Sequence, residues 1–101
     1  MAEITKLDET GFETEVLKSD VSVVVLFKAE WCPGCEAVLP VVEELADEGT
    51  KAFYIDVGES PNVAVRYGIM SIPTTIVFAG GEAKATFVGA VAKEKIEGEL
   101  K

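Results

Sequence analysis

The stretch Val21–Phe27, VSVVVLF, constrains the fold of this 101-residue chain more than any other segment. Its residues are apolar and mostly β-branched, apart from Ser22, and the run is far shorter than the ~20 residues that a membrane-spanning helix needs. Such a run is typical of a strand that is covered on both faces of its sheet. We therefore expect a central strand here, with helices packed on each side.

The rest of the chain predicts an alternation of strands and helices around this strand, with apolar residues at the period of each element. The expected strands are 4–6, 21–27, 52–56, 75–78 and 84–88, and the expected helices are 10–18, 33–49, 61–67 and 93–100. Asp8 or Thr10 can cap the first helix, Ser60 the third, and Pro40 lies inside the second. Gly80-Gly81 suits the two-residue turn of a closing hairpin.

This order, β-α-β-α-β-α-β-β-α, predicts an α/β fold in one domain, residues 1–101. Helical crossovers imply parallel pairing in the first part, whereas the hairpin is antiparallel. The prediction is a mixed five-stranded sheet with helices on both faces.

The charge of the chain limits its partners. Its net charge is −9, which argues against nucleic acid or an anionic membrane, because Lys and Arg are needed to neutralise phosphate. The N-terminal segment has neither the basic nor the apolar part of a secretory signal. We expect a cytoplasmic protein that does not associate with membranes.

The chemistry of the chain centres on its two cysteines, Cys32 and Cys35, in EWCPGCEA. A disulfide across this spacing closes a loop of about four residues and would stabilise the fold by only roughly 2 kcal/mol. Zinc prefers four nitrogen or sulfur ligands, and the chain has two cysteines and no histidine, although two chains could share a site. A redox pair is favoured over a metal site or an inert pair.

The placement of the pair predicts different roles for the two sulfurs. If the helix begins at Pro33, Cys32 lies at its N-terminus, where free N–H groups and the helix dipole stabilise a thiolate. Cys32 is then the nucleophile, and Cys35, one turn further and more buried, is the resolving cysteine. Pro33 suits the first helical position, which needs no N–H donor.

The sequence resembles the thioredoxin family over essentially its whole length. The motifs that carry the resemblance are AEWCPGC at 29–35, YGIMSIPT at 67–74 and VGA at 88–90, with Pro40 at the position of the family's helix kink. The resemblance implies the thioredoxin fold and a thiol–disulfide oxidoreductase that reduces disulfides of partner proteins. It also implies a monomer without a bound cofactor or metal, re-reduced by a thioredoxin-reductase-type electron donor, and a role in electron transport and cell redox homeostasis.

The resemblance also implies the residues around the cysteines. Pro73 is expected to be cis and to pack beside the disulfide. The substrate polypeptide is expected to lie extended across a shallow apolar groove and to pair with backbone groups of Ile72. The residues expected to form this groove are Trp31, as a half-exposed wall, with Pro33, Gly34, Ile72, Pro73, Val88 and Gly89.

Two departures from the family bear on the chemistry. Thioredoxins usually read W-C-G-P-C, whereas this chain reads W-C-P-G-C, and a proline directly after the first cysteine is the glutaredoxin pattern. The family's buried aspartate, thought to assist proton transfer at the resolving cysteine, is replaced here by Leu26. The family's tryptophan two residues later is Lys28, and the lysine that accompanies the aspartate is replaced by Ala52 or Lys51.

Two alternatives therefore stand beside the thioredoxin-type reductase. Pro33 favours a glutaredoxin-like, glutathione-linked reductase. Against this alternative, few basic residues lie near the cysteines to bind the carboxylates of glutathione, and Lys28 is the plainest candidate. The other alternative is a non-enzymatic thioredoxin-fold module that binds partners or shares a cluster between two chains.

Overall fold

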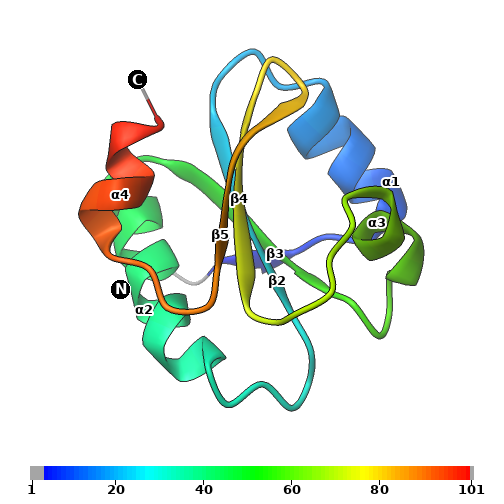
Figure 1. The fold of residues 1–101 in the computed structure, drawn as a ribbon. Helices are drawn as coiled ribbons and strands as arrows, with labels where there is room; N and C mark the ends of the chain where they lie inside the picture. Colours follow the sequence, from blue (N-terminus) through cyan, green and yellow to red (C-terminus); the bar gives the residue numbers. More distant parts are fainter. Residues whose placement is uncertain (1–3, 101) are drawn as a thin grey trace.

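The computed structural model describes residues 4–100, and its centre is the predicted apolar strand. This strand, β2, spans Val23–Lys28, and its first five residues are completely buried. It begins two residues later than expected because Val21 lies outside the sheet and is 54% exposed. Figure 1 shows β2 in the middle of the molecule, with helices on both sides of the sheet.

The sheet has five strands in the order β1-β3-β2-β4-β5. β3 (Lys51–Asp56) pairs in parallel with β2 and with the short edge strand β1 (Thr5–Lys6). β4 (Thr74–Ala79) pairs antiparallel with β2 and with β5 (Glu82–Val88). The predicted mixed sheet is thus confirmed, and β2 is the strand at which parallel pairing changes to antiparallel.

The closing hairpin has the predicted turn. Gly80 and Gly81 connect β4 to β5 with φ angles of +61° and +82°. Two successive residues with positive φ are the signature of the type I′ turn, whose twist matches that of the flanking strands. A Cβ at Gly81 would also meet the backbone oxygen of Leu17 at 2.6 Å, so a side chain has no room there.

Two layers of helices cover the sheet (Figure 1). α2 (Cys35–Asp47) and α4 (Lys93–Gly98) lie on one face, where Val38, Val42 and Ile96 pack against residues of β2 and β4. The other face is covered by α1 (Glu9–Phe12), its continuation η1 (Glu13–Leu17) and α3 (Pro61–Arg66). The predicted arrangement of helices on both faces is confirmed.

The first predicted helix is divided into two kinds of turn. Of the two residues expected to cap this helix, Asp8 is the one that does so. Its Oδ1 accepts a hydrogen bond of 2.7 Å from the N–H of Gly11. The chain then widens into a π-helical turn, in which the N–H of Lys18 donates to the carbonyl of Glu13 at 3.1 Å. Periodicity alone does not distinguish this turn from α-helix, because both present Phe12 and Val16 to the core.

The last helix is attached to α2 by charge as well as by packing. The Lys93 ammonium donates to the carboxylates of Glu48 and Glu44, both near the end of α2. These hydrogen bonds, to Glu48 first and then to Glu44, raise the pKa of Lys93 above its ordinary value. The helix ends at Gly98, two residues earlier than predicted.

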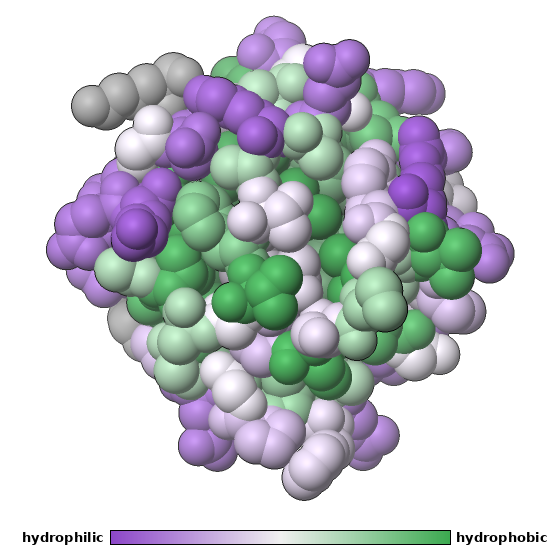
Figure 2. Space-filling model, in the orientation of Figure 1, coloured by the Kyte–Doolittle hydropathy of each residue, from purple (hydrophilic) through white to green (hydrophobic). Residues whose placement is uncertain are grey.

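Hydrophilic and apolar side chains are unevenly distributed over the face of the molecule that Figure 2 shows. Figure 2 shows hydrophilic side chains toward the margins of this face and apolar or weakly polar ones over its middle, where β4 and β5 lie in Figure 1. Among residues 4–100, no helix combines the length and the apolar character that crossing a membrane requires.

Candidate active site

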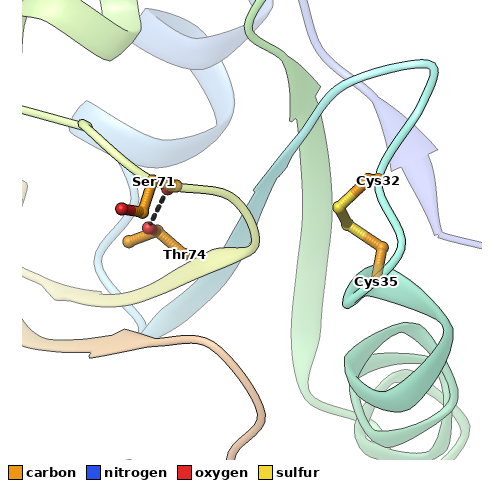
Figure 3. The surroundings of a disulfide bond; sticks show 4 residues. All are labelled: Cys32, Cys35, Ser71 and Thr74. Atoms are coloured by element: carbon orange, nitrogen blue, oxygen red, sulfur yellow. Dashed lines mark hydrogen bonds between the residues drawn. A yellow bond between two sulfur atoms is a disulfide. The ribbon is translucent and has the colours of Figure 1, made fainter.

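The two cysteines form a disulfide at the end of β2. The Cα atoms of Cys32 and Cys35 are 5.3 Å apart, and Figure 3 shows the bond between the loop after β2 and the first turn of α2. Cys32 is half-buried, whereas Cys35 is only 5% exposed. The sulfur that the sequence assigns to attack is therefore the more accessible one.

The helix that carries the pair begins later than predicted. α2 starts at Cys35 rather than at Pro33, and Gly34 is its N-cap. Pro33 and Gly34 form a tighter turn, closed by a hydrogen bond of 3.0 Å from the N–H of Cys35 to the carbonyl of Cys32. Cys32 thus precedes a helical turn that leads into α2, so the positive end of the helix dipole still lies close behind it.

Gly34 lies directly against Pro73. The Ile72-Pro73 peptide bond is cis, as the resemblance implied. A Cβ placed on Gly34 would be 2.8 Å from the Cδ of Pro73, closer than real Cβ contacts. The glycine is therefore required by a close approach between the cysteine turn and the start of β4, since any side chain here would force one segment to move.

A hydrogen bond connects Gly89, from the VGA segment at 88–90, to Pro73. The N–H of Gly89 donates to the carbonyl of Pro73 at 2.8 Å, with Gly89 at a φ of +80°. Val88 is paired with Thr74 and is 66% exposed. The Thr74 hydroxyl donates to the carbonyl of Ser71 at 2.6 Å and closes the turn before β4 (Figure 3). Three segments far apart in the sequence thus meet beside the disulfide.

Trp31 differs from the expected half-exposed wall. Its side chain is 81% exposed, so it is more accessible to solvent than the half-exposed side chain that was expected. A hollow of about 500 Å³ lies on the α2 side of the disulfide, lined by Trp31, Cys32, Pro33 and charged residues. Ile72 lines a separate hollow of about 210 Å³ with Ile69 and Met70. The single substrate groove expected from the resemblance stays a prediction.

Charges of both signs line the larger hollow. They come from Lys28 at the end of β2, from Glu30 in the loop and from Glu36 in α2. The Lys28 ammonium lies 5.0 Å from the centre of the Tyr54 ring, which is within the range of a cation–π interaction.

Leu26 belongs to the apolar core on the α2 side of the sheet. It is completely buried and clusters with Val38, Val42 and Ala52. Leu26 and Ala52, one of the two residues considered for the family's lysine position, are therefore both part of this apolar cluster. The side chain at position 26 therefore cannot gain or lose a proton, unlike the aspartate usual in the family.

Sequence reasoning missed one polar residue next to this position. Thr75 pairs with Leu26 across the β2–β4 ladder, is completely buried, and its Oγ1 has no hydrogen-bond partner among the described residues. The pattern assigned Thr75 only to a strand. The available signal was the second threonine of the strand segment TTIVF, which comes directly after Ile-Pro-Thr and before three apolar residues.

Within residues 4–100, no group of three or more His, Cys, Asp or Glu side chains is placed to hold a metal ion. The Cys32–Cys35 disulfide is itself a group that can be reduced by two electrons. A C-x-x-C disulfide at the start of a helix, opposite a cis-proline at the start of a neighbouring strand, defines a protein whose own cysteine pair is the redox centre.

The chain belongs to the thioredoxin family. The family model described as Thioredoxin matches residues 3–101. Thioredoxin M4, chloroplastic, of Arabidopsis thaliana is 47% identical over 98 residues, which cover 94% of this chain but 51% of the relative. The thioredoxin of Porphyra purpurea is 38% identical, in a match that covers 96% of this chain and 94% of the relative. The thioredoxin of Acidithiobacillus ferridurans is 40% identical, in a match that covers 92% of this chain and 89% of the relative. The chain thus spans about half of the Arabidopsis relative and most of the other two.

Proposed function

We propose that this chain is a thiol–disulfide oxidoreductase of thioredoxin type, which reduces disulfides in partner proteins. The observation that carries the proposal is the position of an unequally buried cysteine pair opposite cis-Pro73. An accessible sulfur next to a buried one suits a two-step exchange, in which the first binds the substrate and the second releases it.

In the proposed reaction, the Cys32 thiolate attacks one sulfur of the partner disulfide. A bond forms between Cys32 and that sulfur, and the other partner sulfur leaves as a thiolate. The Cys35 thiolate then attacks Cys32, the mixed disulfide breaks, and the Cys32–Cys35 disulfide forms. Two electrons pass to the partner, and the N–H groups at the start of α2 stabilise the attacking thiolate.

The substrate is proposed to bind as an added strand beside Ile72. Among the described residues, neither the N–H nor the C=O of Ile72 forms a backbone hydrogen bond, so both can pair with an extended peptide. Val88 and Trp31 supply exposed apolar surface nearby, and Gly89 presents backbone without a side chain. Pro33, which lines the hollow beside the disulfide, and Gly34, which lies against Pro73, are proposed to bound this site on the side of α2.

The two alternatives raised by the sequence are not proposed. The matching family model and the relatives named above are all thioredoxins, which does not favour a glutathione-linked reductase despite Pro33. The paired, oxidised cysteines do not favour a module without redox activity.

The partners and setting of the reaction are part of the proposal. The electron donor is a thioredoxin-reductase-type enzyme, the substrates are disulfide-containing proteins, and the chain acts as a monomer. The cytoplasmic location expected from the sequence stays a prediction, and the Arabidopsis relative carries the word chloroplastic in its name.

Reduction of insulin disulfides by the protein, driven by a thioredoxin reductase and NADPH, tests the proposal. The wild type should reduce insulin, Cys32→Ser should be inactive, and Cys35→Ser should accumulate a mixed disulfide with insulin that a reducing gel separates. The same assay with glutathione and glutathione reductase should give no comparable turnover. Insulin reduction by Cys32→Ser, or turnover with glutathione alone, would contradict the proposed function.

A further inference from the structure

A buried hydroxyl without a partner requires an explanation, because most buried polar side-chain atoms are hydrogen-bonded. Among the described residues, the Oγ1 of Thr75 is the only buried side-chain nitrogen or oxygen atom without a partner. Thr75 is completely buried in β4, so bulk solvent does not satisfy its hydroxyl. The structure with this orphan hydroxyl is the one in which Cys32 and Cys35 are oxidised.

The strand register places this hydroxyl on the side of the sheet that faces the cysteines. Side chains alternate along a strand, so Pro73, Thr75 and Val77 lie toward the same face. Pro73 meets Gly34, and Val77 belongs to the cluster that contains Val38 of α2. Thr75 therefore lies between these two contacts, below the first turn of α2.

Cys35 is the first residue of that turn and is almost completely buried. Across the ladder from Thr75 stands Leu26, whose side chain offers no hydrogen bond. A disulfide sulfur is a weak acceptor, whereas a thiolate is a charged acceptor that strengthens a hydrogen bond considerably. Reduction of the disulfide, followed by loss of the Cys35 proton, would thus supply the strong acceptor that the hydroxyl lacks.

We propose that the Thr75 hydroxyl donates a hydrogen bond to the Sγ of Cys35 in the reduced protein and stabilises its thiolate. This role differs from that of a carboxylate at position 26, because a neutral donor on β4 stabilises the thiolate of Cys35 but does not accept its proton. The inference rests on the proposed function of Cys35 as the resolving cysteine, which the mixed-disulfide trap tests independently.

In the resolving step, the Cys35 thiol gives its proton to solvent water and its thiolate attacks the Sγ of Cys32. The Cys32–Cys35 bond forms as the bond from Cys32 to the partner sulfur breaks. The partner sulfur leaves with the electron pair and takes a proton from water. Thr75 neither gains nor loses a proton, because it acts only by hydrogen bonding to the charged form of Cys35.

Other groups also influence the ionisation of Cys35. Lys28 of β2, Glu30 of the loop and Glu36 of α2 line the hollow beside it, with the Tyr54 ring of β3 below the Lys28 ammonium, and the Cys32 thiol is its nearest titrating neighbour. All of these groups remain when Thr75 alone is changed. A difference between variants at residue 75 therefore reports on the hydroxyl.

The test compares Thr75→Val, which removes the hydroxyl from a side chain of the same shape, with Thr75→Ser, which keeps it. The pKa of Cys35 is measured in the reduced full-length protein from the pH dependence of its ¹³Cβ chemical shift. We expect the pKa to rise by about one unit in Thr75→Val and to stay within a few tenths of the wild type in Thr75→Ser.

A kinetic measurement accompanies the titration. Reduced protein is mixed with 5,5′-dithiobis(2-nitrobenzoate), and release of the second thionitrobenzoate reports the resolving step. A tenfold smaller thiolate fraction, partly offset by the greater nucleophilicity of a more basic thiolate, predicts a roughly threefold slower step in Thr75→Val near neutral pH. Thr75→Ser should restore the wild-type rate.

Thr74→Val is the matched control, because it removes a hydroxyl from the adjacent residue, which lies on the opposite face of β4 and bonds Ser71. It should leave the pKa of Cys35 unchanged. An unchanged pKa in Thr75→Val, or an equal rise in Thr75→Ser, would overturn the inference. If Cys35→Ser fails to trap a mixed disulfide while the pKa shift in Thr75→Val is observed, the proposed function fails and the hydrogen bond stands.

Discussion

Gly34 and Pro73 approach each other so closely that a Cβ on the glycine would lie 2.8 Å from the Cδ of the proline ring. Gly34 belongs to the cysteine turn, and Pro73 directly precedes β4. The carbonyl of Pro73 also accepts a hydrogen bond from the N–H of Gly89. The absence of a side chain at residue 34 thus determines how near the disulfide lies to the surface proposed to bind the substrate.

Replacing Gly34 by alanine should therefore impair both stability and activity. The proline ring is rigid, so the backbone of one segment must move, at a cost of about 1–3 kcal/mol in the free energy of unfolding. Urea unfolding of the oxidised protein measures this loss, and insulin reduction should slow because Pro73 and Cys32 no longer keep their spacing.

Gly98→Ala is the matched control, since Gly98 lies in α4 and an added Cβ there meets nothing within 4 Å. Alanine in a helix is more favourable than glycine by up to about 1 kcal/mol, so this variant should be as stable as the wild type or more stable. Equal effects of the two substitutions would show that the contact with Pro73 has no consequence.

Cys32 should react with iodoacetamide much faster than Cys35 in the reduced protein near neutral pH. Cys32 is half-buried at the entrance to a helical turn, whereas Cys35 is 5% exposed beneath it. Peptide mapping after brief exposure identifies the labelled cysteine. Predominant labelling of Cys35 would reverse the proposed roles.

Leu26→Asp should destabilise the protein in a pH-dependent way. Leu26 is completely buried, so desolvation should raise the pKa of an aspartate there well above its unfolded value of ~3.9. The folded variant then keeps its proton longer than the unfolded chain, and its stability falls as pH rises from the unfolded pKa to the folded one. A rise of about three units costs roughly 4 kcal/mol at neutral pH, beyond the loss of packing.

Urea unfolding of oxidised Leu26→Asp and Leu26→Asn at about pH 5 and pH 8 isolates the ionisation, because asparagine has the same size and does not titrate. The stability gap between the two variants should widen at the higher pH. A constant gap would mean that residue 26 is hydrated in the folded protein.

Thr75→Val should stabilise the oxidised protein. A buried hydroxyl without a partner costs about 1–3 kcal/mol relative to a satisfied one, and valine removes this cost without leaving a cavity. We expect an increase of about 1 kcal/mol in the free energy of unfolding from urea titrations with the disulfide intact. If valine is clearly destabilising, the hydroxyl is satisfied in solution by a buried water.

The reduction potential of the Cys32–Cys35 pair should be less negative than the ~−270 mV of thioredoxin and lie toward the ~−200 to −230 mV of glutaredoxins. The reason is the glutaredoxin-like Pro33, and a shift of about 30 mV requires only ~1.4 kcal/mol between the two redox forms. Equilibration with glutathione buffers, followed by Trp31 fluorescence, measures the potential. A value at or below ~−270 mV would contradict this prediction.

The sequence was sufficient to predict elements whose pattern depends on local chemistry. The apolar run of β2 and the Gly80-Gly81 turn each correspond to one backbone geometry; the turn lies where expected, and β2 is shifted by two residues at its start and one at its end. The start of α2 was placed two residues too early, because Pro33 and Gly34 form a turn whose hydrogen bond closes over three residues, and composition does not distinguish it from the helix.

Properties that depend on distant neighbours were harder to predict. The exposure of Trp31 is decided by what the other loops leave uncovered, and the closeness of Gly34 to Pro73 by how β4 meets the cysteine turn. The orphan hydroxyl of Thr75 follows from its register opposite Leu26, which becomes visible only when both strands are in place.

The strand order has a consequence for amide hydrogen exchange. The edge strand β1 contributes only Thr5 and Lys6, both exposed, so its hydrogen bonds to β3 can open with little loss of buried surface. β2 is paired along its length on both sides, and its amides should exchange only when most of the domain unfolds. The loop carrying Cys32 extends from this slowest-exchanging strand, so local opening at the N-terminal edge leaves the cysteine pair in place.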